Sequence, residues 1–239
     1  MDQLPDNLCI IMSSVIRSPR VVILSMVLPF FVSCVSTREM PLSDPSVLRG
    51  KSVARTDRKT PDFAAITPGK ATGAAFGLIG GAIAGAAMVS SGNAIVNENG
   101  VEDPANWISQ KLAGEMKRKY GTAIKGSRTV TDEEPEKIAK ACDGADFALD
   151  VRTVNWSLAY FPANWGTYRV IYSAQLRLID CKTGKVVAQG FYARIPEKSE
   201  DSPDWDELVE KDRAARLKKE LEIGAQEALH HFRTNLLKL

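Results

Sequence analysis

The sequence has few of the residues on which catalytic and metal sites are commonly built. Only two histidines occur in 239 residues, and they are adjacent, His230 and His231. On a helix, adjacent side chains point about 100° apart, so this pair cannot hold one metal ion together. Four cysteines are too few for a disulfide-rich scaffold. A net charge of +2 gives no broad basic surface, so nucleic acid is not an expected partner.

Sequence motifs for catalysis are missing as well. No nucleophile elbow supports Ser-His-Asp chemistry. Gly-Lys pairs, such as those at residues 69–70 and 184–185, complete no phosphate-binding loop. We therefore expect no catalytic residues, no metal site and no cofactor, and we expect that the protein is not an enzyme.

The amino terminus has the pattern of an export signal. Arg17 and Arg20 precede a short apolar run over residues 21–32, and Ser33 and Cys34 follow it. A basic region, a short apolar region and a small residue at the cleavage point are typical of a signal peptide. The run is shorter than the ~20 residues that a stable membrane span needs. We predict a signal peptide over residues 1–33, with Met12 as an alternative start.

The end of this signal, Phe31-Val32-Ser33-Cys34, resembles the lipobox of bacterial lipoproteins. The resemblance implies that Cys34 becomes the first residue of the mature chain and carries acyl chains such as palmitate. Val35 in place of Asp after the cysteine then implies the outer membrane, with the protein facing the periplasm. The alternative is an ordinary secretory signal with an unmodified Cys34. Residues 34–60, rich in Ser, Thr, Pro and charged residues, are predicted to form a lipidated tether.

Residues 61–91 combine a short strand candidate with an unusual glycine pattern. Five glycines recur at a spacing of four: Gly69, Gly73, Gly77, Gly81 and Gly85. On a helix they share one face, which another helix can approach closely. The pattern resembles the glycine zippers of some envelope proteins and favours self-association or membrane insertion. Two alternatives stay open, a Gly/Ala-rich loop and a helix packed against its own domain.

Residues 101–239 predict one α+β domain. Asp103-Pro104 begins a helix that Gly121 ends, and a short helix fits residues 133–141. Alternating apolar residues predict strands over 146–156, 168–180 and 185–195, joined as an antiparallel meander. A long amphipathic helix opens at Ser202-Pro203 and covers the sheet. The expected fold is an antiparallel sheet of three to four strands covered by helices, plus the glycine-zipper helix.

This order of elements resembles the α+β domain of several envelope proteins. They include the curli-secretion lipoprotein, the lipoprotein activators of peptidoglycan synthases and the amino-terminal domain of TolB. The resemblance covers roughly residues 60–70 and 101–239. The stretch WSLAYFPANWGTYRVIYSAQLRLIDCKTGKVV also looks like part of a family of uncharacterised bacterial lipoproteins with a glycine-rich segment.

Cys142 and Cys181 are the expected disulfide pair. If the strands 146–156 and 168–180 pair antiparallel, these cysteines lie just outside the same end of the pair. An oxidising periplasm would favour the bond. The alternative is two unlinked thiols.

The connection over residues 157–167 is rich in aromatic residues, and Tyr160, Phe161 and Trp165 are its candidate partner-binding residues. Exposed rings would form a binding rim, whereas the alternative is that the connection folds back as a lid. We expect a non-enzymatic, membrane-anchored envelope protein that self-associates or binds an envelope partner. The alternative is a module that binds a small molecule or a cell-wall fragment between the sheet and the long helix.

Overall fold

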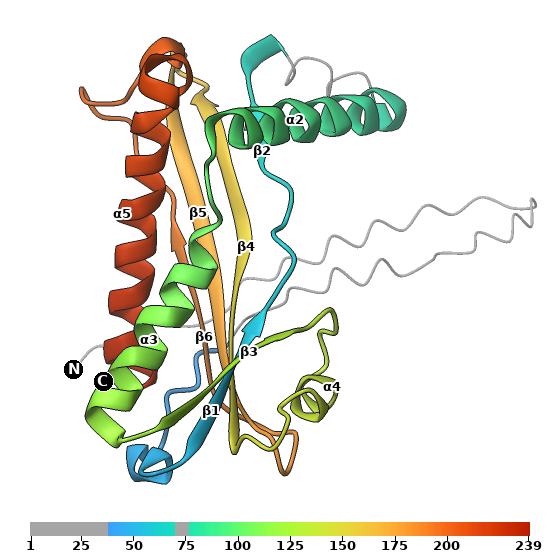
Figure 1. Cartoon of the computed structure of the whole chain (residues 1–239). Helices are drawn as coiled ribbons and strands as arrows, with labels where there is room; N and C mark the ends of the chain where they lie inside the picture. Colours follow the sequence, from blue (N-terminus) through green and yellow to red (C-terminus); the bar gives the residue numbers. More distant parts are fainter. Residues whose placement is uncertain (1–37, 70–76) are drawn as a thin grey trace, which may run out of the picture. The chain divides into compact units, whose positions relative to one another are not determined.

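The computed structural model describes the backbone of residues 38–69 and 77–239, with side chains given from residue 85 in the second range. The predicted signal peptide, the lipidation site Cys34 and the glycine Gly73 lie outside the described residues. The described chain is an α+β fold with one mixed sheet of six strands (Figure 1). The strands are β1 (Ser52–Asp57), β2 (Ala64–Ile66), β3 (Ala123–Thr129), β4 (Phe147–Phe161), β5 (Asn164–Asp180) and β6 (Val186–Arg194).

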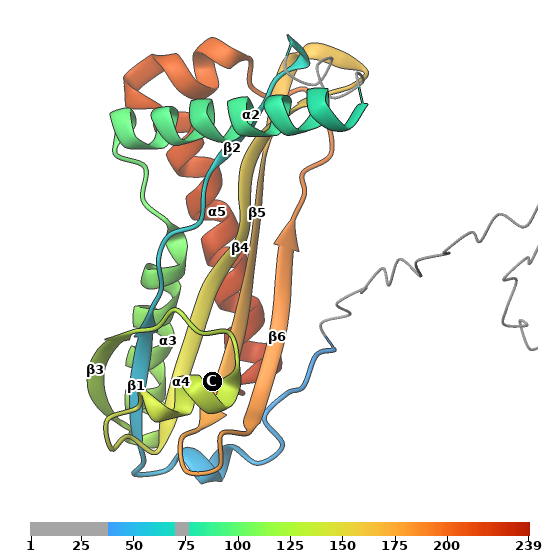
Figure 2. The same ribbon diagram turned by 90° about the vertical axis from the view of Figure 1, so that its right-hand side faces the viewer.

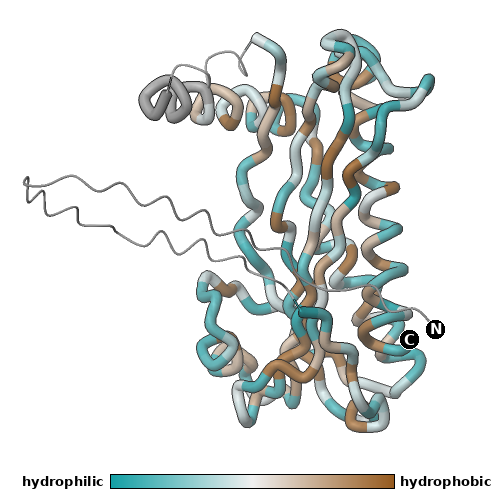
Figure 3. The backbone as a smooth tube through the Cα atoms, turned by 180° about the vertical axis from the view of Figure 1, so that it is seen from behind, coloured by the Kyte–Doolittle hydropathy of each residue, from teal (hydrophilic) through white to brown (hydrophobic). Residues whose placement is uncertain are grey.

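The predicted meander is present and is formed by β4, β5 and β6, which pair antiparallel in chain order. The β4–β5 hairpin is longer than expected, because both strands continue through most of residues 157–167 and turn at Pro162-Ala163. Phe147 lies opposite Asp180 at one end of the hairpin, and Tyr160 lies opposite Tyr168 near the other. Polar and apolar residues alternate along these strands, as Figure 3 shows by colour.

The prediction of a wholly antiparallel sheet of three to four strands is wrong. The sheet order is β3-β1-β4-β5-β6, and β1 pairs parallel with both β3 and β4. Strand β2 also pairs parallel with β4, farther along it. Strand β3 gave no signal in the sequence because its residues, AIKGSRT, are mostly exposed and show no apolar alternation.

The segment from Met40 to Asp57, expected to be part of a tether, instead belongs to the folded body. Met40 forms an isolated bridge with Gln189 of β6. Leu42 and Leu48 are buried, and Leu48 ends a short 3-10 turn that precedes β1. Composition alone suggested a tether, but these few apolar side chains are enough to hold the segment against the domain.

Two helices cover one face of the sheet, α3 (Pro104–Tyr120) and α5 (Ala215–His231) (Figures 1 and 2). The predicted ends of α3 are confirmed. Asp103 caps its first turn by accepting a hydrogen bond from the backbone N–H of Ala105 at 3.0 Å, and Gly121 ends it in the left-handed conformation. Both helices bury apolar residues against the sheet, which forms the main core.

The predicted uninterrupted final helix is wrong at its start. A π-turn at Asp206–Glu210 is followed by three consecutive residues with positive φ, at Asp212, Arg213 and Ala214. Only then does α5 begin. Burial explains the break, because Leu208 and Ala214 are both fully buried in the main core on either side of the kink. None of the three residues is glycine, so no sequence pattern indicates the turn.

The opposite face of the sheet carries the short helix α4 (Pro135–Lys140) at one end. Below it lies a second apolar cluster that includes Ile138, Ala148 and Ile179. Cys142 and Cys181 form a disulfide there, with Cα atoms 6.1 Å apart, as the expected strand pairing required. The bond ties the end of α4 to the turn after β5.

Helix α2 (Gly77–Asn99) contains the last three glycines of the zipper pattern, and its carboxyl half packs on the domain. Gly92 allows the contact, because a Cβ there would lie 2.0 Å from the backbone oxygen of Phe63 just before β2. Asn93 adds two hydrogen bonds, one from the Phe63 N–H and one to Asp62. Gly85, two turns earlier, faces open space. Within the described residues, no helix has the length and apolar character that crossing a bilayer requires.

We predict that Gly92→Ala weakens the docking of α2, because the new methyl group cannot share space with the Phe63 carbonyl. The free energy of unfolding should fall by about 1–3 kcal/mol in urea titrations. Gly85→Ala is the matched control, since it adds the same methyl group to the same helix in open space. It should leave stability unchanged or raise it by up to about 1 kcal/mol. Equal losses in both variants would contradict the close contact.

Removing the disulfide should lower stability through the unfolded state, because the bond closes a loop whose ends are 39 residues apart. The chain-entropy model gives about 4 kcal/mol for a loop of this length. We expect that reduction lowers the free energy of unfolding, measured by urea titration, by an amount of this order. The double variant Cys142→Ser/Cys181→Ser should have the lower unfolding free energy of the reduced protein, with or without reductant. A reductant effect that persists in the double variant would contradict this account.

Candidate functional site

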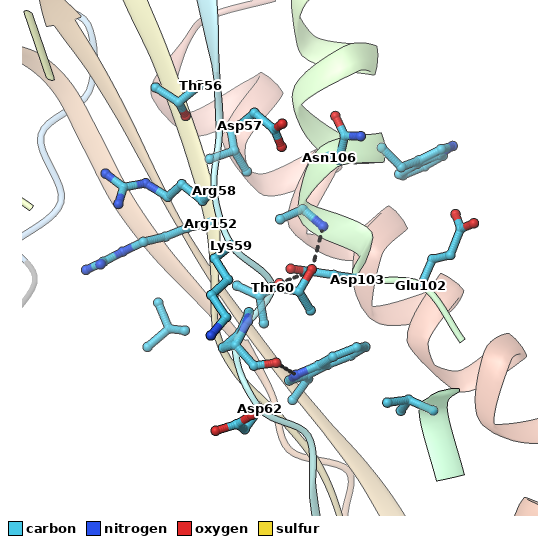
Figure 4. A pocket seen from close by; sticks show the side chains of 18 of the residues that line it. Thr56, Asp57, Arg58, Lys59, Thr60, Asp62, Glu102, Asp103, Asn106 and Arg152 are labelled. Carbon is cyan, nitrogen blue, oxygen red and sulfur yellow. Dashed lines mark hydrogen bonds between the residues drawn. The ribbon is translucent and has the colours of Figure 1, made fainter. Parts of the chain in front are cut away.

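A groove opens where the edge of the sheet is interrupted. The pairing of β1 with β4 stops at Leu149, and the pairing of β2 with β4 begins at Ser157. Between these points the chain from Arg58 to Asp62 leaves β1 and runs beside the groove (Figure 4). The groove has a volume of about 1240 Å³ and is lined by this segment, by residues 151–154 of β4 and by the start of α3.

The groove has two sides of different chemistry. Figure 4 shows Asp57, Asp103 and Asn106 on the side of α3, whereas Arg58 and Arg152 extend away from that helix. Alternation along β4 explains the division, because Val151 faces the main core while Arg152 belongs to the opposite face of the sheet. We call these the α3 side and the arginine side.

Asp103 organises the α3 side. Its carboxylate caps α3 and also accepts a hydrogen bond from the hydroxyl of Thr153 in β4. Burial raises the pKa of Asp103, and these two hydrogen bonds only partly oppose the effect. Behind it, the Tyr172 hydroxyl lies 3.3 Å from the Thr153 oxygen, and burial raises the pKa of Tyr172 too. This polar chain fixes the start of α3 against the groove.

Two large apolar residues are exposed in the same groove. Trp107 of α3 is 37% exposed and Val154 of β4 is 46% exposed. Lys111 lies over the Trp107 ring, with its ammonium 5.6 Å from the ring centroid. Exposed apolar side chains within a concave, mostly polar site are typical of a surface that contacts a ligand or partner.

Asp150 is the centre of the arginine side. It is 1% exposed and accepts hydrogen bonds from Arg58, from Arg177 of β5 and from the Thr56 hydroxyl. The Arg58 Nε–Asp150 Oδ1 distance is 2.6 Å and the Arg177 Nη2–Asp150 Oδ2 distance is 2.7 Å. Burial alone would raise the pKa of Asp150, but the hydrogen bond and charge of Arg58, with the charge of Arg177, outweigh it and lower the pKa.

The carboxylate of Glu133, just before α4, lies near all three arginines. Arg152 contacts its carboxylate, and Arg58 lies 3.3 Å and Arg177 3.8 Å from it. Arg152 also donates to the Gln175 side chain at 3.0 Å. Burial lowers the pKa of Arg152, and the charges of Arg177 and Arg58 lower it further against the opposing effect of Glu133. The five charges of this group therefore leave one positive charge in excess.

The predicted aromatic rim lies elsewhere, at the tip of the β4–β5 hairpin. Trp165 is 63% exposed and makes an edge contact with Tyr160, with ring centroids 6.5 Å apart. Phe161 is buried, with the Arg169 guanidinium 5.2 Å from its ring centroid. Of the three candidate residues, Trp165 is thus exposed, Tyr160 is half-buried and Phe161 is part of the packed structure.

The groove expected between the sheet and the long helix is filled by side chains. Leu217, Leu221 and Ala228 of α5 are buried against the sheet. A Cβ on Gly224 would lie 3.2 Å from the Tyr172 side chain, so helix and sheet are in close contact there. This part of the helix–sheet contact is core. A smaller pocket of about 470 Å³ lies beside α5 at its carboxyl end, between Tyr192 of β6 and residues 226–235.

Sequence reasoning missed the arginine side entirely. Arg58 falls within the predicted tether, and no motif marks Arg152 or Arg177. One usable signal was the hairpin register, which places Asp150 directly opposite Arg177 as an opposite-charge pair across two strands. No cluster of three or more metal-ligating side chains occurs in residues 38–69 and 77–239.

Comparisons with known proteins give only distant similarities. No protein-family model and no curated protein matches the sequence. Among solved structures, a neuraminyllactose-binding hemagglutinin homologue from Helicobacter pylori is 10% identical with a TM-score of 0.40, over 84% of this chain and 87% of that one. The lipoprotein GNA1162 from Neisseria meningitidis is 14% identical with a TM-score of 0.29, over 77% and 99%. The LpoB C-terminal domain from Salmonella enterica is 12% identical with a TM-score of 0.24, over 62% and 85%. Similarities at this level do not establish a shared function.

We predict that Asp150→Asn destabilises the protein, because Arg58 and Arg177 lose their buried counter-charge. At neutral pH the free energy of unfolding should fall by about 3–5 kcal/mol. The folded-state pKa of Asp150 is lowered, so its contribution is complete above the unfolded value of about 4 and is lost as the pH falls through the folded value. Urea titrations should therefore show a difference in unfolding free energy between the natural protein and the variant that is large at pH 7 and smaller in acid.

Asp143→Asn is the matched control for this prediction. Asp143 also pairs with an arginine, Arg128, but its side chain is 72% exposed. Its replacement should cost less than about 1 kcal/mol. If both variants lost the same stability, Asp150 would not be the anchor of the buried charges.

Proposed function

We propose that this protein is a lipid-anchored component of the bacterial cell envelope that acts by binding, with its binding site in the groove beside β4. The export signal and Cys34 support the anchor and the location. The observation that carries the binding function is the placement of Trp107 and Val154, both exposed, in one groove among fixed polar groups. Packing both residues against a ligand would remove their apolar surface from water.

The chemistry of the lining indicates a ligand with polar and apolar parts. The α3 side offers the Asn106 amide and several carboxylates, and the arginine side offers guanidinium groups. Binding sites commonly have volumes of about 300–1,000 Å³, so a groove of about 1240 Å³ suits a segment of a larger molecule. A polymer such as a cell-wall glycan or an extended peptide fits this description better than a small metabolite.

Binding rather than catalysis also accounts best for the perturbed groups of the groove. Asp103, the carboxyl with a raised pKa, is occupied in holding α3 and Thr153. Asp150 is occupied by two arginines. Each of these two carboxyl groups thus has a structural role, and that role accounts for its shifted pKa without a catalytic function.

Self-association through α2 is a second candidate, favoured by Gly85. This glycine faces open space, whereas Gly92 on the same helix is in close contact with β2. The amino half of α2 could therefore receive a helix from a second copy, as small residues permit.

Site-specific photocrosslinking tests the groove as the binding site. A benzophenone amino acid at Val154 in the full-length, membrane-anchored protein should give a position-dependent adduct in intact cells, identified by mass spectrometry. The control is the same probe at Ile195, which is 58% exposed and lies outside the groove. A Val154 adduct that disappears with Trp107→Ala would support the proposal.

Two results would contradict the groove. One is the absence of any adduct from Val154, and the other is the same adduct pattern from both positions. An adduct of twice the protein's own mass, from either position, would favour self-association instead.

A further inference from the structure

Three arginines from separate parts of the fold meet around Asp150 and Glu133, and two of them, Arg58 and Arg152, line the groove. Arg58 follows β1, Arg152 belongs to β4 and Arg177 belongs to β5. We call them, with Asp150 and Glu133, the arginine cluster. Guanidinium groups repel one another, so three of them meet only where anionic oxygens hold them.

The two carboxylates of the cluster have different characters. Asp150 is 1% exposed, accepts hydrogen bonds from Arg58 and Arg177 and has no freedom to leave. Glu133 has a side chain that is 56% exposed and belongs to the chain just before α4. Asp150 is therefore a fixed internal counter-ion, and Glu133 is an exposed one.

Contacts that do not involve the Glu133 side chain hold all three arginines in place. Arg177 donates to the Glu133 carbonyl oxygen at 2.7 Å, and Arg58 donates to the Asp132 carbonyl oxygen at 3.0 Å. Arg152 is oriented by Gln175. If the Glu133 carboxylate swings into solvent, the three guanidiniums thus remain aligned and one site for an anionic group becomes free.

We infer that the arginine cluster binds the oxyanion of a ligand, a phosphate or carboxylate group, in the position that the Glu133 carboxylate occupies. The inference rests on the proposed binding function of the groove, and it names the chemistry that the ligand presents on this side. Guanidinium groups match such oxyanions because they donate two parallel hydrogen bonds.

Two energetic points support the exchange. An exposed carboxylate gains little from an ion pair because water screens the charges, so Glu133 leaves at little cost. The cluster also carries one positive charge in excess even with Glu133 present, because three guanidiniums face two carboxylates. A dianionic group would neutralise this charge better than the single carboxylate of Glu133.

Inorganic phosphate is the probe for a direct test on the full-length protein in detergent. Its affinity is measured by calorimetry and by the rise of the melting temperature, against sodium chloride at equal ionic strength. Glu133→Gln keeps the shape of the side chain and removes the competing charge, so it should tighten phosphate binding by about fivefold. Arg152→Gln should abolish binding, and Arg152→Lys, which keeps the charge without the planar fork, should weaken it.

Arg128→Gln is the matched control, because Arg128 also pairs with an exposed acidic residue but lies outside the cluster. It should leave phosphate affinity unchanged. The melting temperature of each variant without phosphate shows whether it is folded. Phosphate binding that is absent from both the natural protein and Glu133→Gln would overturn the inference. Phosphate binding that survives in Arg152→Gln would overturn it as well, because the phosphate would then be an adventitious ion only.

Vesicle sedimentation then separates the two sources of such a group. Phosphate-sensitive binding of the unlipidated chain (residues 35–239) to vesicles with phosphatidylglycerol, but not to pure phosphatidylcholine, would assign the oxyanion to a lipid headgroup. Binding of free phosphate without vesicle binding would assign it to a soluble or cell-wall ligand. If phosphate has no effect while the Val154 crosslink persists, the oxyanion inference fails and the proposed function stands.

Discussion

Strand β4 is much longer than β1 and β2, the two strands that pair with it on the groove side. The rest of the domain depends on this difference in length. On its other side β5 pairs with it over nearly its whole length. On the groove side, β1 covers one end and β2 covers a short part nearer the other end. The backbone between them is stabilised by side chains instead of a third strand, with the Trp156 indole donating to the Pro61 carbonyl oxygen at 2.9 Å. An interrupted edge in an otherwise paired sheet is what creates space for a ligand.

The charges beside this interruption follow from the same geometry. No parallel strand continues beside this part of β4. The chain that leaves β1 runs there instead, and its Arg58 pairs with Asp150. Asp150 then lies under two guanidiniums, in a place where an unpaired charge would be very costly. The cluster thus connects the chain after β1 with β4 and β5, and it places positive charge beside the groove.

Local signals in the sequence predicted the parts of the fold that local physics determines. The ends of α3 were predictable because Asp103, Pro104 and Gly121 each satisfy a local backbone requirement. The meander was predictable from alternation, and the Cys142–Cys181 bond followed from its register.

Other parts depended on partners distant in the sequence. Strand β3 is exposed, and it is a strand because β1 lies beside it. The groove arises from the path of residues 58–62, which contain no motif. Its charged residues become neighbours only when β1, β4 and β5 assemble.

The pairing of Met40 with Gln189 has a consequence for the distance between the folded body and its lipid. If Cys34 carries the acyl chains, three residues separate it from Arg38, whose carbonyl oxygen accepts a hydrogen bond from the Gln189 side chain at 3.0 Å. Fully extended, such a connection reaches only about 14 Å. The described chain begins beside β6, at the sheet edge farthest from β3. With such an anchor, the domain would stay next to the bilayer surface and would have no long flexible arm with which to reach farther.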